Sequence, residues 1–170
     1  MSSHVAQPSG TKGGDLRLAI VVSRFNTEVT SGLLKGAQAT VAEAGLAEAE
    51  VIEAPGAFEI PLIAQTLART GRYDGVICLG CVIKGDTAHF EFISLGAAVG
   101  LMSAGLATST PITFGILTTY TDDQAQIRSR DDAHNKGREA ALACIETAHT
   151  LTAIRNAGER RQVGFRTFGE

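Results

Sequence analysis

Runs of apolar residues alternate with segments of helical periodicity along most of this chain. Leu16 to Val22 is largely apolar and predicts a buried strand. In residues 27–44, which follow, apolar side chains recur every three or four positions, as in an amphipathic helix. Gly45 then closes this helix, because glycine readily adopts the left-handed backbone that ends many helices. These segments predict one strand–helix unit.

The same unit occurs three more times. The predicted strands are residues 49–54, 75–80 and 111–117, and the predicted helices are residues 59–70, 89–107 and 122 onward. A last amphipathic segment, residues 137–155, adds a final helix. Such alternation predicts an α/β fold, a three-layer α/β/α sandwich in which helices cover both faces of a four-stranded parallel sheet, with right-handed crossovers.

No linker divides the chain, and 170 residues suit one substantial core. We therefore expect a single domain over residues 16–157. Residues 1–15 and 158–170 are polar or glycine-rich and have little apolar periodicity. They predict a flexible N-terminal arm and a polar C-terminal tail.

Charge and hydropathy exclude several classes of partner. The 15 basic and 18 acidic side chains give a net charge of -3 without a block of like charge, so neither nucleic acid nor a membrane surface is expected as a partner. The longest weakly polar run, residues 95–107, is shorter than the ~20 apolar residues of a membrane span. Residues 1–15 lack the apolar region of a secretion signal. We expect a cytoplasmic protein whose partners are small molecules and other proteins.

The cysteines and histidines point to neither a disulfide framework nor a metal site. Cys78 and Cys81 have a C-x-x-C spacing, but residues three apart on a strand face opposite sides, which favours two small core residues over a redox or metal pair. Cys144 lies on the apolar face of the last predicted helix. The four histidines have no tight ligand spacing. We expect no metal site.

Residues capable of binding and chemistry follow the predicted strands. Ligands of open parallel sheets bind at the carboxyl ends of the strands, and the turns there are residues 23–26, 55–59, 82–88 and 118–121. Phe25 and Phe58 offer flat surfaces for a heterocycle, or they pack back on the core. Glu59 is suited to accepting hydrogen bonds from hydroxyl groups, or to the first turn of a helix, where the dipole favours an acid.

The third of these turns has the properties of a phosphate site. Backbone N–H groups at a helix N-terminus bind anions, and Gly85, Asp86 and Thr87 lie at such a position. His89 follows in the first helical turn, where the helix dipole disfavours a charged imidazole and leaves a neutral base at pH 7. An anion site beside a proton carrier suits chemistry on a small phosphorylated substrate.

Taken together, these turns strongly resemble the lumazine synthase family over residues 16–155. The motifs that carry the resemblance are Arg24-Phe-Asn26, Pro55-Gly-Ala-Phe-Glu-Ile-Pro61, Gly80-Cys-Val-Ile-Lys-Gly-Asp-Thr-Ala-His-Phe90, Phe114-Gly-Ile-Leu-Thr-Thr119 and Asn135-Lys-Gly137. The resemblance implies a flavodoxin-like fold and a transferase of riboflavin biosynthesis without a cofactor. It implies the condensation of 5-amino-6-(D-ribitylamino)uracil with 3,4-dihydroxy-2-butanone 4-phosphate to 6,7-dimethyl-8-ribityllumazine, with release of phosphate and water, which is the penultimate step.

The resemblance also implies roles for particular residues. His89 would be the general acid and base. The residues implied in binding ribitylaminouracil are Phe25, Ala57, Phe58, Glu59, Cys81, Val82, Ile83 and, from a neighbouring subunit, Phe114. Those implied in binding the phosphate substrate are Gly85, Asp86, Thr87 and Arg128, with Lys136 either assisting or lying on the surface.

Assembly and some local features stay open at this stage. The family implies homo-oligomers built from pentamers with active sites at subunit interfaces, while the order of assembly above the pentamer is undetermined, because the charged residues 129–134 replace a glycine-rich family loop. The carboxylate of Asp86 either caps the following helix or tunes phosphate binding. The small residues in the third helix suit contacts between subunits or packing on the sheet; they are Gly96, Ala97, Gly100, Ala104 and Gly105.

Two rival functions are weighed against the synthase. A flavin- or lumazine-binding scaffold with little catalysis would not need a site for a departing phosphate, so the presence of His89 and Arg128 argues against it. An unrelated nucleotide-utilising α/β protein is disfavoured because neither G-x-G-x-x-G after the first strand nor a P-loop is present.

Overall fold

Four parallel strands form the centre of the protein. The computed structural model describes residues 15–162. The strands are β1 (Leu18–Ser23), β2 (Glu50–Ala54), β3 (Gly75–Ile83) and β4 (Ile112–Thr119). They lie side by side in the order β2-β1-β3-β4, with every pair parallel, so that β2 and β4 form the two edges. All four predicted strands are present.

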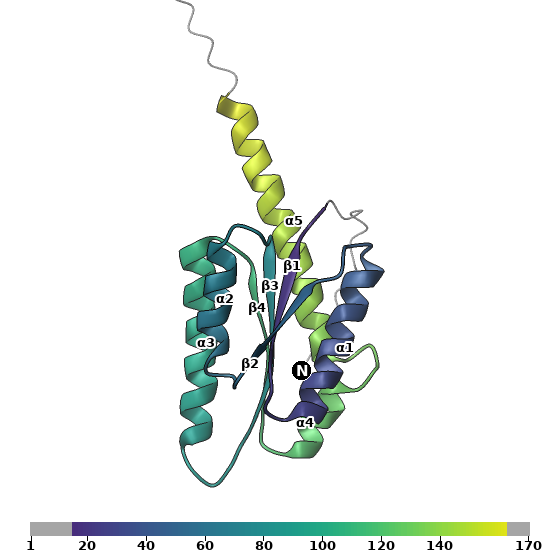
Figure 1. Cartoon of the computed structure of the whole chain (residues 1–170), viewed down its shortest axis with the longest axis vertical. Helices are drawn as coiled ribbons and strands as arrows, with labels where there is room; N and C mark the ends of the chain where they lie inside the picture. The colour runs from purple at the N-terminus through teal and green to yellow at the C-terminus, as the bar shows by residue number, and fades with distance from the viewer. Residues whose placement is uncertain (1–14, 163–170) are drawn as a thin grey trace, which may run out of the picture.

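Helices cover both faces of this sheet (Figure 1). One face carries α1 (Thr27–Glu43), α4 (Asp122–Ser129) and α5 (Lys136–Gln162), and the other carries α2 (Ile60–Arg69) and α3 (His89–Thr108). The predicted three-layer α/β/α sandwich is confirmed. Gly45 and Gly71, which follow α1 and α2, have positive φ values of 72° and 68°, as expected of glycines that end helices.

The alternation of side chains along the strands divides the core into two clusters. Leu18, Ile20 and Val22 of β1 pack toward α1 and α5, whereas Val21 packs toward α2 and α3. Cys81 and Cys78 of β3 divide in the same way. All three cysteines are free and buried. Cys78 and Cys81 are therefore core residues on opposite faces of the sheet, as predicted.

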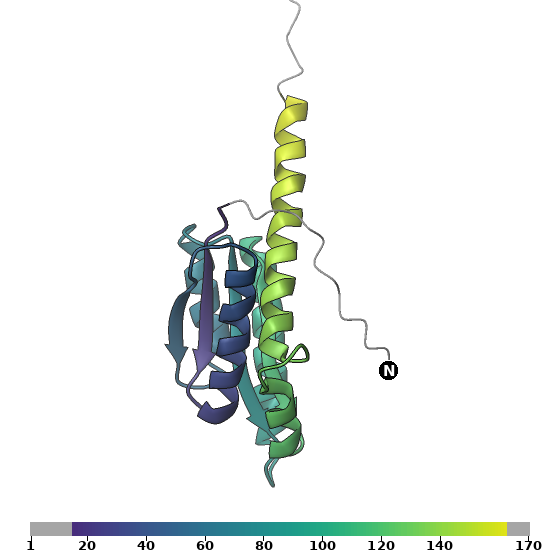
Figure 2. The ribbon, with the colours of Figure 1, turned by 90° about the vertical axis from the view of Figure 1, so that its right-hand side faces the viewer.

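Three elements run further than the sequence pattern indicates. β4 continues to Thr119, two residues past its expected end at residue 117. β3 continues to Ile83, three residues past the expected end, because Val82 and Ile83 pair with Thr118 and Thr119 of β4. α5 continues to Gln162, so residues 158–162 of the predicted tail are helical. Figure 2 shows this end of α5 extending well past the sheet. Residues 1–14 of the predicted arm and 163–170 of the tail lie outside the described residues.

α3 is more apolar than the sequence analysis allowed. It has 20 residues, its most apolar window of 18 residues has a mean hydropathy of 1.6, and it is, within residues 15–162, the one helix long and apolar enough to cross a membrane. The expectation from residues 95–107 was wrong on this point, because the helix begins at His89 and adds Phe90, Phe92 and Ile93 to that run. Core helices pass the same test, and Ala97, Leu101 and Ala104 of α3 lie in the sandwich core.

Candidate functional site

The turns after β1 and β2 meet at Gly56. A Cβ atom at Gly56 would lie 3.0 Å from Oε2 of Glu59 and 3.4 Å from Cδ2 of Phe25. The Phe25 ring is 68% exposed, and its turn is joined to β2 by a 3.0 Å hydrogen bond from Arg24 N to Ala54 O. Glu59 occupies the N-cap of α2 but its side chain makes no capping bond. A flat ring and an uncommitted carboxylate thus flank one glycine.

Phe58 lies over α3. A Cβ atom at Gly96 would be 2.8 Å from Cε2 of Phe58, and one at Gly100 would be 2.8 Å from Cβ of Pro61. These two glycines therefore allow α2 and α3 to pack closely within one subunit, which resolves for them the alternative left open by the sequence. Phe58 remains 56% exposed, while its neighbour Ala57 is buried. The Phe58 ring is a surface available for stacking.

The end of β3 lies beside the Phe25 turn. The side-chain amide of Asn26 donates a 2.9 Å hydrogen bond to the carbonyl oxygen of Cys81. Val82 and Ile83, which follow, are partly exposed strand residues rather than turn residues. Sequence reasoning gave Asn26 no role; an asparagine just before a helix start is a signal for the left-handed backbone that it adopts here, with φ of 55°.

The proposed phosphate turn has backbone N–H groups that are free to bind a ligand. Among the described residues, no hydrogen bond is donated by the backbone N–H groups of Gly85, Asp86 or Thr87. The N–H of His89 is 3.4 Å from Thr87 Oγ1, which is a long contact. The N-cap of α3 is Ala88, and no side chain caps it. Asp86 is therefore not the helix cap, and the three free N–H groups are available to an anion.

Aromatic contacts join this turn to Tyr120, the residue that follows β4. The rings of Phe90 and Tyr120 have centroids 6.0 Å apart, and Nζ of Lys84 lies 5.3 Å from the centroid of Tyr120. Lys84 N also donates a 2.9 Å hydrogen bond to Thr119 O. These contacts join the turns after β3 and β4 to each other.

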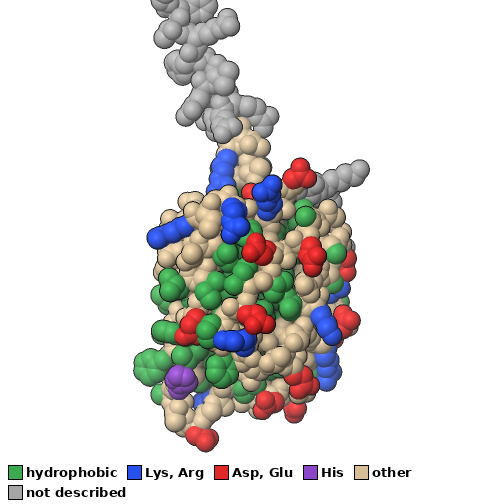
Figure 3. Space-filling model, in the orientation of Figure 1, with side chains coloured by type: hydrophobic (Ala, Val, Ile, Leu, Met, Phe, Trp, Pro, Cys, Tyr) green, Lys and Arg blue, Asp and Glu red, His purple; other side chains and the backbone are tan. Residues whose placement is uncertain are grey.

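A groove of about 610 Å³ runs along the β4 edge. It holds three further residues from the sequence analysis, Phe114, Arg128 and Lys136. Its remaining lining comes from Met102, the other residues of β4, Glu139, Ala140 and Ala143. Figure 3 views the opposite side of the molecule, the β2 edge, where hydrophobic side chains lie across the middle and toward the side formed by α2 and α3, with charged side chains between them.

The polar groups of the groove are suited to a ligand. Nζ of Lys136 is 2.6 Å and 2.7 Å from the two carboxylate oxygens of Glu139, and Nη1 of Arg128 donates a 2.9 Å hydrogen bond to Gln124 O. The hydroxyl of Thr119 is buried and has no hydrogen-bond partner within residues 15–162. A buried hydroxyl without a partner costs free energy unless a ligand engages it.

One chain does not bring all these residues together. The groove contains Phe114, Arg128 and Lys136, but none of the residues of the first three turns: Phe25, Ala57, Phe58, Glu59, Gly85, Asp86, Thr87 and His89. The chain therefore presents two half-sites, one at the carboxyl edge of the sheet and one along β4. Within residues 15–162, no three His, Cys, Asp or Glu side chains gather as a metal site would require.

Fold and half-sites together define an α/β protein whose carboxyl sheet edge carries groups suited to small anionic, hydroxylated and aromatic ligands. Residues 15–152 match the family model of 6,7-dimethyl-8-ribityllumazine synthase. The chain belongs to this family. Its members form 6,7-dimethyl-8-ribityllumazine in riboflavin biosynthesis, and the protein is accordingly a transferase of that step, as the sequence motifs predicted.

Individual relatives agree with the family model. The chain is 70% identical over 141 residues to 6,7-dimethyl-8-ribityllumazine synthase 1 of Caulobacter vibrioides, covering 82% of this chain and 92% of the relative. It is 53% identical over 140 residues to the synthase of Salinibacter ruber, covering 81% and 90%. The synthase of Lactiplantibacillus plantarum is 46% identical over 147 residues, covering 85% and 92%.

Proposed function

We propose that the residues at the carboxyl edge bind and activate the two substrates of the lumazine-forming condensation. Phe25 stacks on the pyrimidine, and backbone groups of Cys81, Val82 and Ile83 meet its edge. Ala57, Phe58 and Glu59 hold the ribityl chain. The observation that supports this assignment is that Phe25 and Glu59 both lie against Gly56. A flat ring and a carboxylate able to accept hydrogen bonds from hydroxyl groups are therefore close enough to meet one substrate.

The phosphate substrate binds at the free N–H groups of Gly85, Asp86 and Thr87. The uracil amine attacks the ketone carbon, and loss of water gives an imine. Protons then shift along the carbon skeleton as phosphate leaves, and ring closure with loss of a second water completes the product. His89, the first residue of α3, moves these protons, while binding both reactants on one surface removes the entropic cost of their encounter.

The complete site is shared between two subunits. The half-site with Phe114, Arg128 and Lys136 carries the fixed cations that a leaving phosphate needs, yet it is separate from the N–H groups of the turn. Joining the β4 groove of one subunit to the carboxyl edge of the next supplies both. Phe114, which is 45% exposed on an edge strand, then covers the neighbour's pyrimidine.

An exposed row of apolar residues supports self-association. Phe92, Leu95, Val99, Met102 and Leu106 on α3 are spaced three and four residues apart, and each is more than half exposed. This spacing is that of helices that pack side by side along a seam. We propose pentamers as the unit of assembly. In such an assembly a neighbouring subunit, and not lipid, covers the apolar row on α3, in keeping with a cytoplasmic enzyme.

The direct test is to mix the purified protein with both substrates and to follow lumazine and phosphate together. Matched formation of both above the spontaneous rate is expected, and Arg128→Ala should chiefly raise the KM for the phosphate substrate. Tight lumazine binding without turnover would indicate the catalytically weak scaffold instead. An unchanged KM in Arg128→Ala would remove Arg128 from the phosphate site.

A mixing experiment tests the shared site. Arg128→Ala and His89→Ala are each impaired in one half-site, so subunits of the two variants that assemble together should restore about a quarter of the sites. The variants are unfolded together in equal amounts, refolded and assayed, with each variant refolded alone as the control. A mixture no more active than the mean of its two components would show that each site lies within one subunit.

A further inference from the structure

Asn135 is a polar residue with no exposed surface, and its side chain joins three segments of the chain. Its amide nitrogen lies 3.0 Å from Gly32 O in α1, 3.0 Å from Ser129 O at the end of α4, and 2.8 Å from Arg130 O. An asparagine amide has two N–H bonds, so three acceptors use all of its donor capacity.

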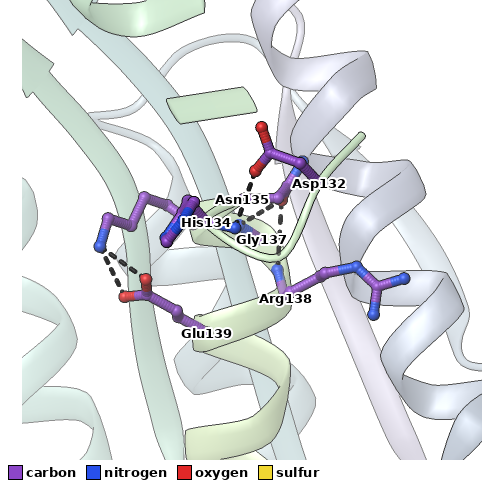
Figure 4. A network of polar contacts seen from close by, with 7 residues as sticks. Asp132, His134, Asn135, Gly137, Arg138 and Glu139 are labelled. Carbon is purple, nitrogen blue, oxygen red and sulfur yellow. Dashed lines mark hydrogen bonds and ion pairs between the residues drawn. The ribbon is translucent and has the colours of Figure 1, made fainter. Parts of the chain in front are cut away.

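The amide oxygen of Asn135 is used as fully as the nitrogen. It accepts hydrogen bonds from Gly137 N at 2.8 Å and from Arg138 N at 3.2 Å, the first free N–H groups of α5 (Figure 4). Asn135 is therefore the N-cap of α5 as well as the link between α4 and α1. A side chain with this many partners holds the α4–α5 connection in one arrangement.

Glycines allow α1 to approach this connection without intervening side chains. A Cβ atom at Gly32 would lie 2.3 Å from Ser129 O, and one at Gly36 would lie 2.3 Å from Oδ1 of Asn135. A Cβ atom at Gly137 would lie 1.9 Å from Leu33 O. The α4–α5 connection therefore packs directly against the backbone of α1, a core helix.

Both cations of the β4 groove are adjacent in sequence to this anchored connection. Arg128 precedes Ser129, whose carbonyl oxygen accepts from Asn135, and Lys136 follows Asn135. Each cation is also held within its own helix, Arg128 by Gln124 O and Lys136 by Glu139. The remaining freedom between the two cations is the relative position of α4 and α5, which the Asn135 amide fixes.

We propose that Asn135 is a positioning residue that sets the spacing between Arg128 and Lys136 and thereby the affinity for the phosphate substrate. This inference rests on the proposed role of the two cations in binding that substrate. Asn135 itself is buried and does not line the groove. It acts only through the backbone on either side of it.

Asn135→Ser separates this role from helix capping. Serine remains a good N-cap for α5, but its hydroxyl cannot reach the carbonyl oxygens of Gly32, Ser129 and Arg130 together. We expect the KM for the phosphate substrate and the inhibition constant of inorganic phosphate to rise by about ten-fold or more, because small displacements of binding groups have large effects. The KM for ribitylaminouracil should change by less than about two-fold.

A matched control excludes a general loss of stability. Val41→Ala removes buried volume at the far end of α1 and should lower the melting temperature without changing the ratio of the two KM values. Gly32→Ala provides a second variant if Asn135→Ser does not fold: its added methyl group displaces Ser129 while Asn135 stays, and it should cause the same selective rise.

The decisive measurement is a double-mutant cycle with Arg128→Ala. If Asn135 acts through the cations, Asn135→Ser should reduce the kcat/KM for the phosphate substrate by much less in the Arg128→Ala background than in the wild type. Fully additive effects, or an equal rise of both KM values, would overturn the role of Asn135 while leaving Arg128 in place. An Arg128→Ala variant with unchanged phosphate inhibition would overturn the cation assignment and this inference together.

Discussion

The side chain of Asn26 holds the carbonyl oxygen of Cys81 across two adjacent strands. The hydrogen bond is 2.9 Å long, and it joins the turn after β1 to the end of β3. Asn26 makes this contact from a left-handed backbone with φ of 55° and ψ of 52°. The two elements proposed to meet the pyrimidine are thus fixed to each other by one amide.

Replacing Asn26 tests both its hydrogen bond to Cys81 and its left-handed backbone. Asn26→Ala loses the hydrogen bond, worth about 1 kcal/mol, and forces alanine into the left-handed region at roughly 1 kcal/mol more. Asn26→Gly loses only the hydrogen bond, so it should be the more stable variant by about 1 kcal/mol in urea denaturation. Both should raise the KM for ribitylaminouracil. Equal stabilities of the two variants would contradict the strain assigned to this residue.

Gly96 is expected to control the position of the Phe58 ring. Gly96→Ala places a methyl group where the ring now lies, 2.8 Å from Cε2, so the ring must move. The KM for ribitylaminouracil should rise several-fold, although the exchange favours helix formation by up to ~1 kcal/mol. Gly105→Ala is the matched control, since its Cβ would lie 3.4 Å from Thr110 O, and it should leave this KM unchanged. Equal KM values in both variants would argue against the role of Phe58.

His89 is expected to contribute proton transfer and little binding. His89→Ala should reduce kcat by ~10²–10⁴-fold and leave both KM values near those of the wild type. Residual turnover above the spontaneous rate is expected because the two substrates are still held together. His134→Ala, at an exposed histidine in the α4–α5 connection, should retain the wild-type kcat. A His89→Ala variant with unaltered kcat would require another proton carrier.

The three thiols are expected to be unreactive in the folded protein. Burial raises the pKa of Cys81 to about 11, with the negative charge of Asp122 adding to the effect. Burial also raises the pKa of Cys144 to about 12 and that of Cys78 well above its ordinary value. At pH 8, a disulfide reagent should therefore modify no thiol in the native state and all three after unfolding. Rapid native modification would contradict their burial.

The ion pair between Glu43 and Arg138 should make a small, pH-dependent contribution to stability. Two hydrogen bonds of 2.8 Å and 2.9 Å join them, and Arg138 lowers the pKa of Glu43 below its ordinary value of 4.5. Because the Glu43 side chain is 62% exposed, Glu43→Gln should cost only about 0.2–1 kcal/mol at pH 7.

The sign of the pH effect follows from the lowered pKa. The folded state favours the ionised carboxylate, so the contribution is complete well above pH 4.5 and is lost as the pH falls through the lower pKa of the folded state. Thermal unfolding at pH 7 and pH 3 should show the wild type and Glu43→Gln converging in acid. Glu48→Gln, at an exposed glutamate without this partner, should show no such convergence. A difference that persists unchanged at pH 3 would exclude the ion pair as its source.

The layers of the fold could be predicted from local sequence patterns, whereas the ends of some elements could not. The alternation of apolar runs and helical periods predicted the parallel sheet and its two helical layers, because such periodicity is a property of each segment alone. The ends of β3 and α5 were not predicted, since strand pairing with β4 extends the first and the second continues through Gly158, a residue type that often ends a helix. The sequence left open whether Gly96 and Gly100 serve contacts between subunits or packing within one subunit. Their close contacts with Phe58 and Pro61 of the same chain show packing within one subunit.

The sequence by itself determined the family, the layers of the fold and the chemical types in the site, because short motifs carry their residue identities and local backbone preferences with them. Only the tertiary structure decided that Arg128, Lys136 and Phe114 share a groove separate from the turn of Gly85 to Thr87. It alone revealed that Asn135 links α1, α4 and α5. Both facts depend on contacts between segments far apart in the chain, and no local pattern of side chains encodes where such segments meet.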